Sequence, residues 1–268
     1  MRRLVSFFRS LLVAGAVAYL AVLVFLFAFQ ESILFPAGTV PLDQDYGFPQ
    51  GVEDLWIERP DGARLHAVRF RTGGPKGVAL YFHGNGATIG KAGWVNAIYE
   101  PLGYDVIALD YRGYGKSRGD RSEQAMLEDA LAFYDQMVAQ GDDAPLIVGR
   151  SLGTVFATYV AAHRPASQLI LYAPPSSIAE VAGHHYPWVP IALLRFPFPT
   201  KKFAAQVSAP ILVFHGTEDQ VIPFESGRSL SKSLKPADQF IPVPGGGHND
   251  IPWRPDVIAH IQEALSGS

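Results

Sequence analysis

Cysteine is absent from this chain of 268 residues. Its absence excludes disulfide bonds and a cysteine nucleophile, and it suits an oxidising compartment. Charge is also scarce, since Asp, Glu, Lys and Arg make up 18% of the residues and the formal net charge is -3 at pH 7. The Lys and Arg residues are scattered along the sequence, so we expect no basic surface and no nucleic-acid partner.

Internal repeats and low-complexity segments are absent too, and metal-binding patterns are sparse. His184 and His185 are the main candidates for a metal site, but adjacent side chains point apart. We therefore expect no metal, and no motif in the sequence implies an organic cofactor.

The longest hydrophobic run is Leu11 to Phe29, nineteen residues without a charge. As a helix it would span about 28 Å, enough for the hydrocarbon core of a bilayer. Arg2, Arg3 and Arg9 precede it and Glu31 follows it, so the positive-inside rule places residues 1–10 in the cytoplasm. The sequence predicts a single-pass signal anchor over 11–29, with the rest of the chain on the extracytoplasmic side, in a periplasm or lumen.

A cleaved signal peptide is the main alternative for this segment. The apolar region of a signal peptide normally runs about 7 to 15 residues and ends at a small-x-small site. Here the run is longer and ends with the bulky Phe27 and Phe29, which favours a retained helix. A buried helix of the soluble domain is a third, less favoured option.

After the anchor, we expect a linker over 30–50 and one domain over 51–268. Alternating patterns over 52–59 and 63–71 predict an antiparallel hairpin. Short apolar runs then alternate with helical stretches such as 122–140, 223–234 and 255–265, a pattern that predicts an α/β fold with a mostly parallel sheet flanked by helices. The expected buried strands are 78–82, 104–109, 146–148, 168–172, 211–214 and 239–243.

The pentapeptide Gly-Arg-Ser-Leu-Gly at 149–153 follows an apolar run and precedes a helix-prone one. A serine nucleophile requires this strand, turn and helix context. Gly149 and Gly153 allow strand and helix to pack closely, so that the hydroxyl of Ser151 projects. The pentapeptide is a weak signal by itself, and its interpretation depends on finding a base, an acid and oxyanion donors.

Candidates for the base and the acid follow two later strands. The run 210–214 is followed by Glu218 and Asp219, and the run 239–243 by a glycine-rich segment that contains His248. His248 would take the proton of Ser151, and Asp219 would orient the imidazole. Glu218 is the alternative acid, less favoured because Asp219 has the better position past the strand end.

An oxyanion hole is expected where the run 78–82 breaks into His-Gly-Asn-Gly at 83–86. The backbone N–H groups of Leu152 and Asn85 are the candidate donors. Because these donors belong to the main chain, replacing the Asn85 side chain should cost less than losing a donor.

Together with Asp-Tyr-Arg-Gly-Tyr-Gly-Lys-Ser at 110–117, these motifs carry a family resemblance. The order Ser, Asp, His is that of α/β-hydrolases and differs from chymotrypsin-like and subtilisin-like folds. The chain resembles membrane-anchored serine esterases with the α/β-hydrolase fold, close to the bem-46-like and depalmitoylase-like branch. The resemblance covers most of the chain after the first forty residues, and it implies hydrolysis of carboxylic esters or thioesters through an acyl-serine intermediate. For residues 110–113 within this segment, a structural turn is the expected role.

Residues 173–203 depart from a plain crossover, because prolines and aromatic residues follow one another closely. We expect a short cap or lid beside the catalytic edge. Trp188, Phe196 and Phe198 would line an acyl pocket, and the apolar side chains of the lid would also rest against the membrane. The alternative is a rigid connector packed on the core.

Two other functions stay open. A serine aminopeptidase or oligopeptidase would use the same three residues, and would need an acidic pocket for the substrate amine. A non-catalytic, membrane-tethered binding protein is less favoured because no candidate catalytic residue is missing. The sequence thus predicts a serine hydrolase acting on small-molecule or lipid esters, and leaves the acyl chain, the leaving group and the oligomeric state open.

Overall fold

The computed structural model describes residues 2–138 and 143–266. Within these residues, eight strands form one sheet in the order β1-β2-β4-β3-β5-β6-β7-β8. The strands are β1 (Glu53–Glu58), β2 (Arg64–Phe70), β3 (Gly77–Phe82), β4 (Tyr104–Leu109), β5 (Leu146–Arg150), β6 (Gln168–Tyr172), β7 (Ile211–Gly216) and β8 (Gln239–Val243).

Strands β1 and β2 form the expected antiparallel hairpin, with Trp56 opposite His66, and β2 also pairs antiparallel with β4. From β4 to β8 every neighbouring pair is parallel. The carboxyl ends of β3, β5, β7 and β8 therefore lie at one edge of the sheet. This is the α/β-hydrolase fold that the sequence predicts.

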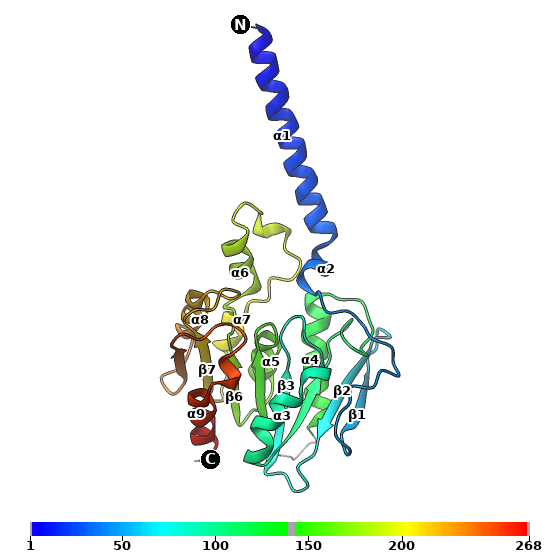
Figure 1. The fold of residues 1–268 in the computed structure, drawn as a ribbon, viewed down its shortest axis with the longest axis vertical. Helices are drawn as coiled ribbons and strands as arrows, with labels where there is room; N and C mark the ends of the chain where they lie inside the picture. The colour runs from blue at the N-terminus through cyan, green and yellow to red at the C-terminus, as the bar shows by residue number, and fades with distance from the viewer. Residues whose placement is uncertain (1, 139–142, 267–268) are drawn as a thin grey trace.

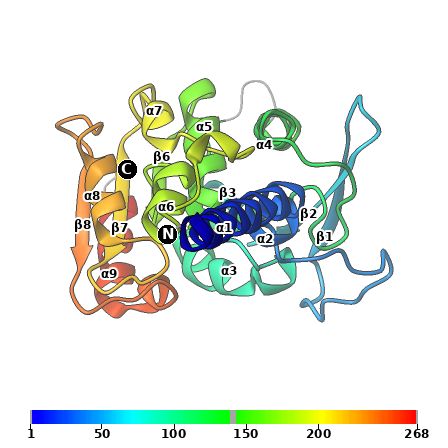
Figure 2. The ribbon, with the colours of Figure 1, turned by 90° about the horizontal axis from the view of Figure 1, so that it is seen from above.

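Helices cover both faces of the sheet (Figure 2). The apolar side chains of β3 alternate between the two layers, with Leu80 and Phe82 packed on one side and Ala79 and Tyr81 on the other. The first layer contains α4 (Glu123–Met137), α5 (Gly153–His163), α7 (Thr200–Ala204) and α8 (Phe224–Ser231), and the second contains α3 (Gly93–Tyr99) and α9 (Pro255–Ser266). Short 3₁₀ helices complete the domain: η1 (Ile89–Lys91), η2 (Glu100–Leu102), η3 (Ile191–Leu193) and η4 (Ile251–Trp253).

The helix expected over 122–140 is α4, and residues 139 and 140 of that expectation lie outside the described part of the chain. Its N-terminus is capped by Ser122, whose hydroxyl accepts a hydrogen bond from the Ala125 N–H. Apolar side chains from one face of the helix, including Phe133, enter the core.

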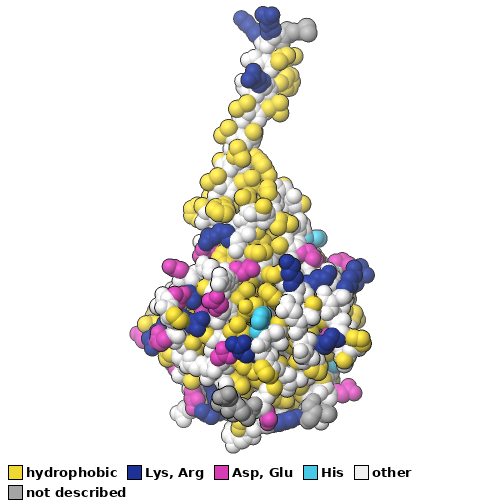
Figure 3. All heavy atoms as spheres, turned by 180° about the vertical axis from the view of Figure 1, so that it is seen from behind, with side chains coloured by type: hydrophobic (Ala, Val, Ile, Leu, Met, Phe, Trp, Pro, Cys, Tyr) yellow, Lys and Arg dark blue, Asp and Glu magenta, His cyan; other side chains and the backbone are white. Residues whose placement is uncertain are grey.

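Helix α1 (Arg2–Ala28) projects away from the domain (Figure 1). It is 27 residues long and apolar enough to cross a membrane, and its side chains are almost all exposed. Hydrophobic side chains cover it between its N-terminal arginines and the top of the domain (Figure 3). A helix that contributes no core contact and exposes this much apolar surface needs an apolar environment.

The segment expected as a linker over 30–50 is partly structured. It begins with a second short helix, α2 (Gln30–Leu34), and the following Phe35 is buried against Phe196, with ring centroids 4.9 Å apart. The chain next to α1 is thus built into the domain. The prediction that residues 30–50 form a linker is therefore wrong for residues 30–35.

The expected lid over 173–203 rises beside the base of α1 (Figure 1). It contains α6 (Ile178–His185), η3 and the beginning of α7. Two contacts join it to the N-terminal helices: Arg195 pairs with Glu31 at 2.8 Å, and the Tyr19 hydroxyl donates to the Trp188 carbonyl at 2.8 Å. The lid and the base of α1 therefore contact each other directly.

Candidate active site

The parallel sheet brings the four sequence-predicted loops to one edge. Ser151 follows β5, Asp219 follows β7, His248 follows β8 and Asn85 follows β3. Because carboxyl ends of parallel strands share an edge, residues up to 163 positions apart in the chain become neighbours.

Ser151 occupies a sharp turn between β5 and α5. Its φ is 52°, in the left-handed region that residues other than glycine rarely adopt, and its N–H donates to the Tyr172 carbonyl at 2.8 Å. A Cβ at Gly153 would lie only 2.0 Å from the Phe82 carbonyl oxygen. A glycine at 153 is therefore required for α5 to begin so close to β3, and this packing places Ser151 at the carboxyl edge of the sheet.

Ser151, His248 and Asp219 form a continuous chain of hydrogen bonds. The Nε2 atom of His248 lies 2.9 Å from Ser151 Oγ, and its Nδ1 atom lies 2.7 Å from Asp219 Oδ2. An acceptor-only carboxylate at Nδ1 assigns the proton to that nitrogen, and leaves Nε2 free to accept from the serine hydroxyl. Ser151 and Asp219 are only 7% and 5% exposed.

The Asp219 carboxyl is held in its ionised form. Burial favours the neutral form, but the hydrogen bond from His248 and two backbone donors outweigh it, so the pKa of Asp219 lies below its ordinary value. The backbone donors are the N–H groups of Val221 and Ile222, each 2.9 Å from Oδ1. Glu218, the alternative acid, has an exposed side chain, and it is Asp219 that contacts the imidazole.

The two candidate oxyanion donors belong to neighbouring residues, Leu152 and Asn85, which line the same pocket as Ser151. Leu152 is the first residue before α5, and among the described residues neither its N–H nor that of Asn85 has a backbone acceptor. The Asn85 side chain is engaged at both ends, since its amide donates to the Leu34 carbonyl at 2.6 Å and its Oδ1 accepts from the Tyr114 hydroxyl at 2.7 Å. Both backbone groups are thus available to a ligand.

His83 and His215 contact neighbouring backbone. His83 Nδ1 lies 2.9 Å from the Gly84 carbonyl oxygen, and His215 Nε2–H donates to the Ile222 carbonyl at 3.0 Å. Burial lowers the pKa of His215, against the opposing effects of the Ile222 bond and of Asp219. A neutral His215 therefore fixes the turn whose N–H groups hold the Asp219 carboxylate.

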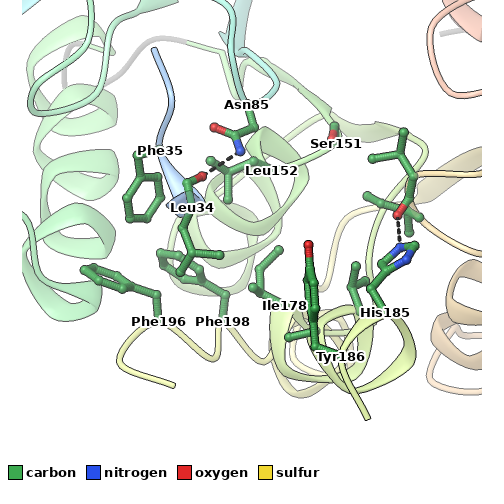
Figure 4. Close-up of a pocket in the computed structure, with 14 residues that line it drawn as sticks. Leu34, Phe35, Asn85, Ser151, Leu152, Ile178, His185, Tyr186, Phe196 and Phe198 are labelled. Carbon is green, nitrogen blue, oxygen red and sulfur yellow. Dashed lines mark hydrogen bonds between the residues drawn. The ribbon is translucent and has the colours of Figure 1, made fainter. Parts of the chain in front are cut away.

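The serine hydroxyl faces an apolar pocket of about 180 Å³ (Figure 4). Its apolar wall is formed by Leu34, Phe35, Leu152, Ile178, Val181, Ala182, Phe196, Phe198, Val221 and Ile222. The polar lining consists of Asn85, Ser151, His185 and Tyr186. No Asp or Glu of the described chain lines it, so the pocket offers no carboxylate to a substrate amine.

Phe196 and Phe198 line this pocket, as the sequence predicts, but Trp188 does not. The side chain of Trp188 is 49% exposed at the tip of the lid, because the lid turns it outward beside α1. Sequence reasoning also missed Leu34 and Phe35. The apolar run 33–35, directly after the polar run 30–32, was the available signal.

A second pocket of about 400 Å³ is lined by His83 and by residues that follow the loop with Gly84. It is lined by Arg150 and Lys91 together with His83, Thr88 and several aromatic residues, and by no described carboxylate. Arg150 Nη2 donates to Asn249 Oδ1 at 2.6 Å. A Cβ on Gly84 would lie 3.3 Å from both Arg150 Nη1 and Ser151 Cβ, so this basic pocket adjoins the nucleophile.

Comparison with known proteins agrees with the fold. The family model described as "Serine aminopeptidase, S33" matches residues 73–203. An uncharacterized protein of Mycobacterium tuberculosis, Rv2307c, is 35% identical over 252 residues, which cover 90% of this chain and 89% of that protein. Lysophosphatidylserine lipase ABHD12 of Mus musculus is 32% identical over 234 residues, 76% of this chain. The matched region is 55% of the length of that lipase, so the chain spans about half of it.

Among solved structures, the Pyrococcus furiosus esterase Pf2001 has a TM-score of 0.70 at 15% identity, covering 86% of this chain and 96% of the esterase. Est1E from Butyrivibrio proteoclasticus, solved with bound ferulic acid, has a TM-score of 0.62 at 19% identity, covering 80% and 96%. Sequence relatives over most of the chain and the same fold in these enzymes lead to one assignment. The chain belongs to the α/β-hydrolase superfamily of serine hydrolases.

Proposed function

We propose that this serine ester hydrolase cleaves the carboxylic ester of a lipid with one acyl chain, through an acyl-Ser151 intermediate. The observation that carries the proposal is the chain of hydrogen bonds from Ser151 through His248 to Asp219, which opens into an apolar pocket. A thioester would enter the same reaction, since only the leaving atom differs.

In the first half-reaction, Ser151 Oγ attacks the ester carbonyl while His248 Nε2 takes its proton. Asp219 stabilises the imidazolium, and the N–H groups of Leu152 and Asn85 bind the oxyanion. The carbon–oxygen bond to the alcohol then breaks, and the alcohol leaves with the proton from His248. Water, activated by the same imidazole, hydrolyses the acyl-serine and returns the hydroxyl of Ser151.

The two pockets beside Ser151 favour a substrate with two unlike ends. The apolar pocket fits an acyl chain, and the basic pocket with Arg150 and Lys91 fits an anionic leaving group. Lysophosphatidylserine, the substrate in the name of the ABHD12 relatives, has this combination of one acyl chain and an anionic headgroup. We propose the same class of substrate here.

We also propose that α1 is a retained membrane anchor with residues 11–29 in the bilayer. In this arrangement residues 1–10 are cytoplasmic, and the catalytic domain over 51–268, with its lid over 173–203, is extracytoplasmic. The exposed apolar surface of α1 and the arginines at its N-terminus support the proposal. An anchor of this kind keeps the catalytic domain at a lipid surface.

The proposed function is tested with a fluorophosphonate probe and a series of p-nitrophenyl esters from acetate to palmitate, using detergent-solubilised protein. We expect labelling and turnover that vanish in Ser151→Ala, with rates highest for medium or long chains. A peak at acetate would indicate small soluble esters. If no ester is turned over faster than by Ser151→Ala, the esterase proposal fails, and peptide hydrolysis or ligand binding without catalysis becomes the better explanation.

Recognition of an anionic leaving group by the basic pocket is tested separately. Hydrolysis of oleoyl lysophosphatidylserine is compared with that of neutral monooleoylglycerol in wild type and in Arg150→Gln. We expect the KM for the anionic lipid to rise about tenfold while the neutral lipid serves as the internal control. Equal effects on the two lipids would remove Arg150 from headgroup recognition.

A serine aminopeptidase is the second candidate, favoured by the description of the matching family model. The pocket at Ser151 argues against it, because no described carboxylate lines that pocket. The two candidate activities are compared by measuring hydrolysis of aminoacyl p-nitroanilides with the same preparation. Turnover of these amides faster than of the esters would favour the aminopeptidase.

A further inference from the structure

The lid reaches well up the side of α1. Tyr19, whose hydroxyl donates to the Trp188 carbonyl at 2.8 Å, stands nine residues before the end of α1 at Ala28. Nine helical residues rise about 13 Å. With α1 as the proposed anchor, the tip of the lid lies about 13 Å inside the boundary at which the helix leaves the membrane, at the depth of the acyl chains.

The composition of the lid tip suits that depth. No Asp, Glu, Lys or Arg stands between Glu180 and Arg195, and the side chains of Tyr186, Trp188 and Ile191 are exposed. Exposed aromatic and aliphatic side chains on an uncharged segment are stable where they meet lipid rather than water.

Some of the polar backbone groups of the lid tip are paired within the protein. Pro187 and Pro190 have no N–H to leave unpaired, and the bond between Tyr19 and Trp188 pairs a hydroxyl with a carbonyl that hydrocarbon would leave without partners. The charged pair Arg195–Glu31 lies at the base of the lid, next to the domain. The boundary between charged and uncharged residues thus falls at the same level on the lid and on the N-terminal helices.

A pocket of about 330 Å³ separates this part of the lid from the N-terminal helices. Leu26 and Phe27 of α1 and Ile33 of α2 form one wall, and Val189 and Ile191 of the lid form the other. Nearly every residue around it is apolar.

One amide side chain, Gln30, lines the same pocket, and both its nitrogen and its oxygen are hydrogen-bonded. Its Nε2 donates to the Leu193 carbonyl at 2.9 Å, and its Oε1 accepts from the Arg195 N–H at 2.6 Å. These two hydrogen bonds hold α2 against the end of η3. The pocket therefore presents a mainly apolar surface, and the one amide on it is engaged with the lid backbone.

The pocket between the helices and the lid adjoins the pocket at Ser151. The two share Leu34, Ala182 and Tyr186 as lining residues, and Figure 4 shows Tyr186 pointing into the inner pocket from the lid. Leu34, Ala182 and Tyr186 are therefore the side chains that an acyl chain would pass on its way from the outer face of the lid, at acyl-chain depth, to the serine hydroxyl.

We propose that this outer pocket is a lateral portal, through which the acyl chain of a single-chain membrane lipid passes directly from the adjoining leaflet to Ser151. The inference rests on the proposed esterase function and on α1 as an anchor, and it gives α1 a second role as one wall of the route. An acyl chain that stays in contact with apolar surface throughout avoids exposure to water. Its ester and headgroup stay on the domain side of the Arg195–Glu31 pair, toward the basic pocket with Arg150.

The first test narrows the portal with Val189→Trp in the full-length protein, reconstituted in dioleoylphosphatidylcholine vesicles. The matched control is Ala192→Trp, which adds an indole to the same lid at an exposed position outside both pockets. The readout is the rate on oleoyl lysophosphatidylserine embedded in the vesicles, divided by the rate on p-nitrophenyl acetate added from water.

We expect this ratio to fall about tenfold or more in Val189→Trp and to change less than about twofold in Ala192→Trp. Equal ratios in the two variants would overturn the portal. If the wild-type rate is no higher than that of Ser151→Ala on either ester, the proposed esterase function fails instead. The depth measurement below then decides by itself whether the lid lies where a portal would be.

The second test measures that depth. Because the chain has no cysteine, a nitroxide can be placed at Trp188→Cys alone, with Glu263→Cys on α9 as the control in water. We expect the label at 188 to collide more with oxygen than with a water-soluble nickel chelate, and the label at 263 to do the reverse. A label at 188 that favours the nickel chelate would overturn the portal whatever the activity.

Discussion

Asn85 donates a hydrogen bond from its side-chain amide to the backbone carbonyl of Leu34, over 2.6 Å. This contact joins α2, at the base of the proposed anchor, to the loop proposed as the oxyanion hole. The other end of the amide accepts from the Tyr114 hydroxyl at 2.7 Å and from the Gly86 N–H at 3.1 Å. The side chain thus orients the loop, while the backbone N–H of the same residue is left for the substrate.

Asn85→Ala tests the separate roles of the Asn85 side chain and its backbone N–H. We expect kcat to fall about tenfold, less than the roughly 100-fold or greater loss typical of a missing oxyanion donor, because the backbone N–H remains. KM should change little, since loop orientation matters most in the transition state. Steady-state kinetics with a p-nitrophenyl ester measure both constants. Asn96→Ala on α3 is the control, and a loss no larger than in that variant would contradict the prediction.

Gly153→Ala should destabilise the protein as well as inactivate it. The added Cβ would lie 2.0 Å from the Phe82 carbonyl oxygen and 2.5 Å from that of His83, so α5 or β3 must move. We expect the free energy of unfolding to fall by at least about 2 kcal/mol, because backbone atoms cannot yield as a side chain can. Urea unfolding in detergent micelles, followed by tryptophan fluorescence, measures the change.

Gly93→Ala is the matched control for that substitution. Gly93 opens α3, and nothing lies within 4 Å of a Cβ placed there. Since alanine is the better helix former, this variant should be as stable as wild type or slightly more so. If both variants unfolded alike, close packing at 153 would not be the cause.

Most strands of the parallel sheet were predictable because their residues are buried on both faces, although β8 at the edge is mostly exposed or half-buried. An uninterrupted apolar run leaves little choice of element, and the run 104–109 matches β4 residue for residue. The order of the motifs then placed Ser151, Asp219 and His248 at one edge, where the structure brings them within hydrogen-bonding distance.

The contribution of the N-terminal segment was not predictable in the same way. Helix α2 is five residues long and is held by contacts to the lid, such as the bond from Gln30 to the Leu193 carbonyl, 163 positions away in the chain. Sequence periodicity contains no information on such a contact. For the same reason the sequence identified Trp188 as a lid aromatic but could not show that it faces outward.

A pH dependence of stability follows from His215. Its pKa in the unfolded chain is about 6.5, and burial lowers the pKa in the folded protein. Below about pH 6.5 the unfolded state therefore binds a proton that the folded state does not, and the free energy of unfolding falls as pH falls. The contribution is present above pH 6.5 and is lost toward the folded pKa, with a slope of up to about 1.4 kcal/mol per pH unit.

His215→Gln removes this titration and keeps a donor for the Ile222 carbonyl. We expect a shallower loss of stability than in wild type between about pH 6.5 and pH 5, measured by urea unfolding at each pH. The exposed His163→Gln should keep the slope of wild type. An unchanged slope in His215→Gln would mean that another group causes the acid sensitivity.

Chain-length preference should respond to Val181, which lines the pocket at Ser151 from α6. Phe196 is a poorer choice for this test, because it is 1% exposed and its truncation would cost about 3–5 kcal/mol of stability. Val181→Phe fills pocket volume instead, so kcat/KM for the palmitate ester should fall about tenfold more than that for acetate, and the optimum should shift to shorter chains. The control is His184→Phe, because residue 184 is exposed on the same helix and lies outside both pockets. This variant should keep the chain-length optimum of wild type. Equal losses on acetate and palmitate in Val181→Phe would show that the acyl chain lies elsewhere.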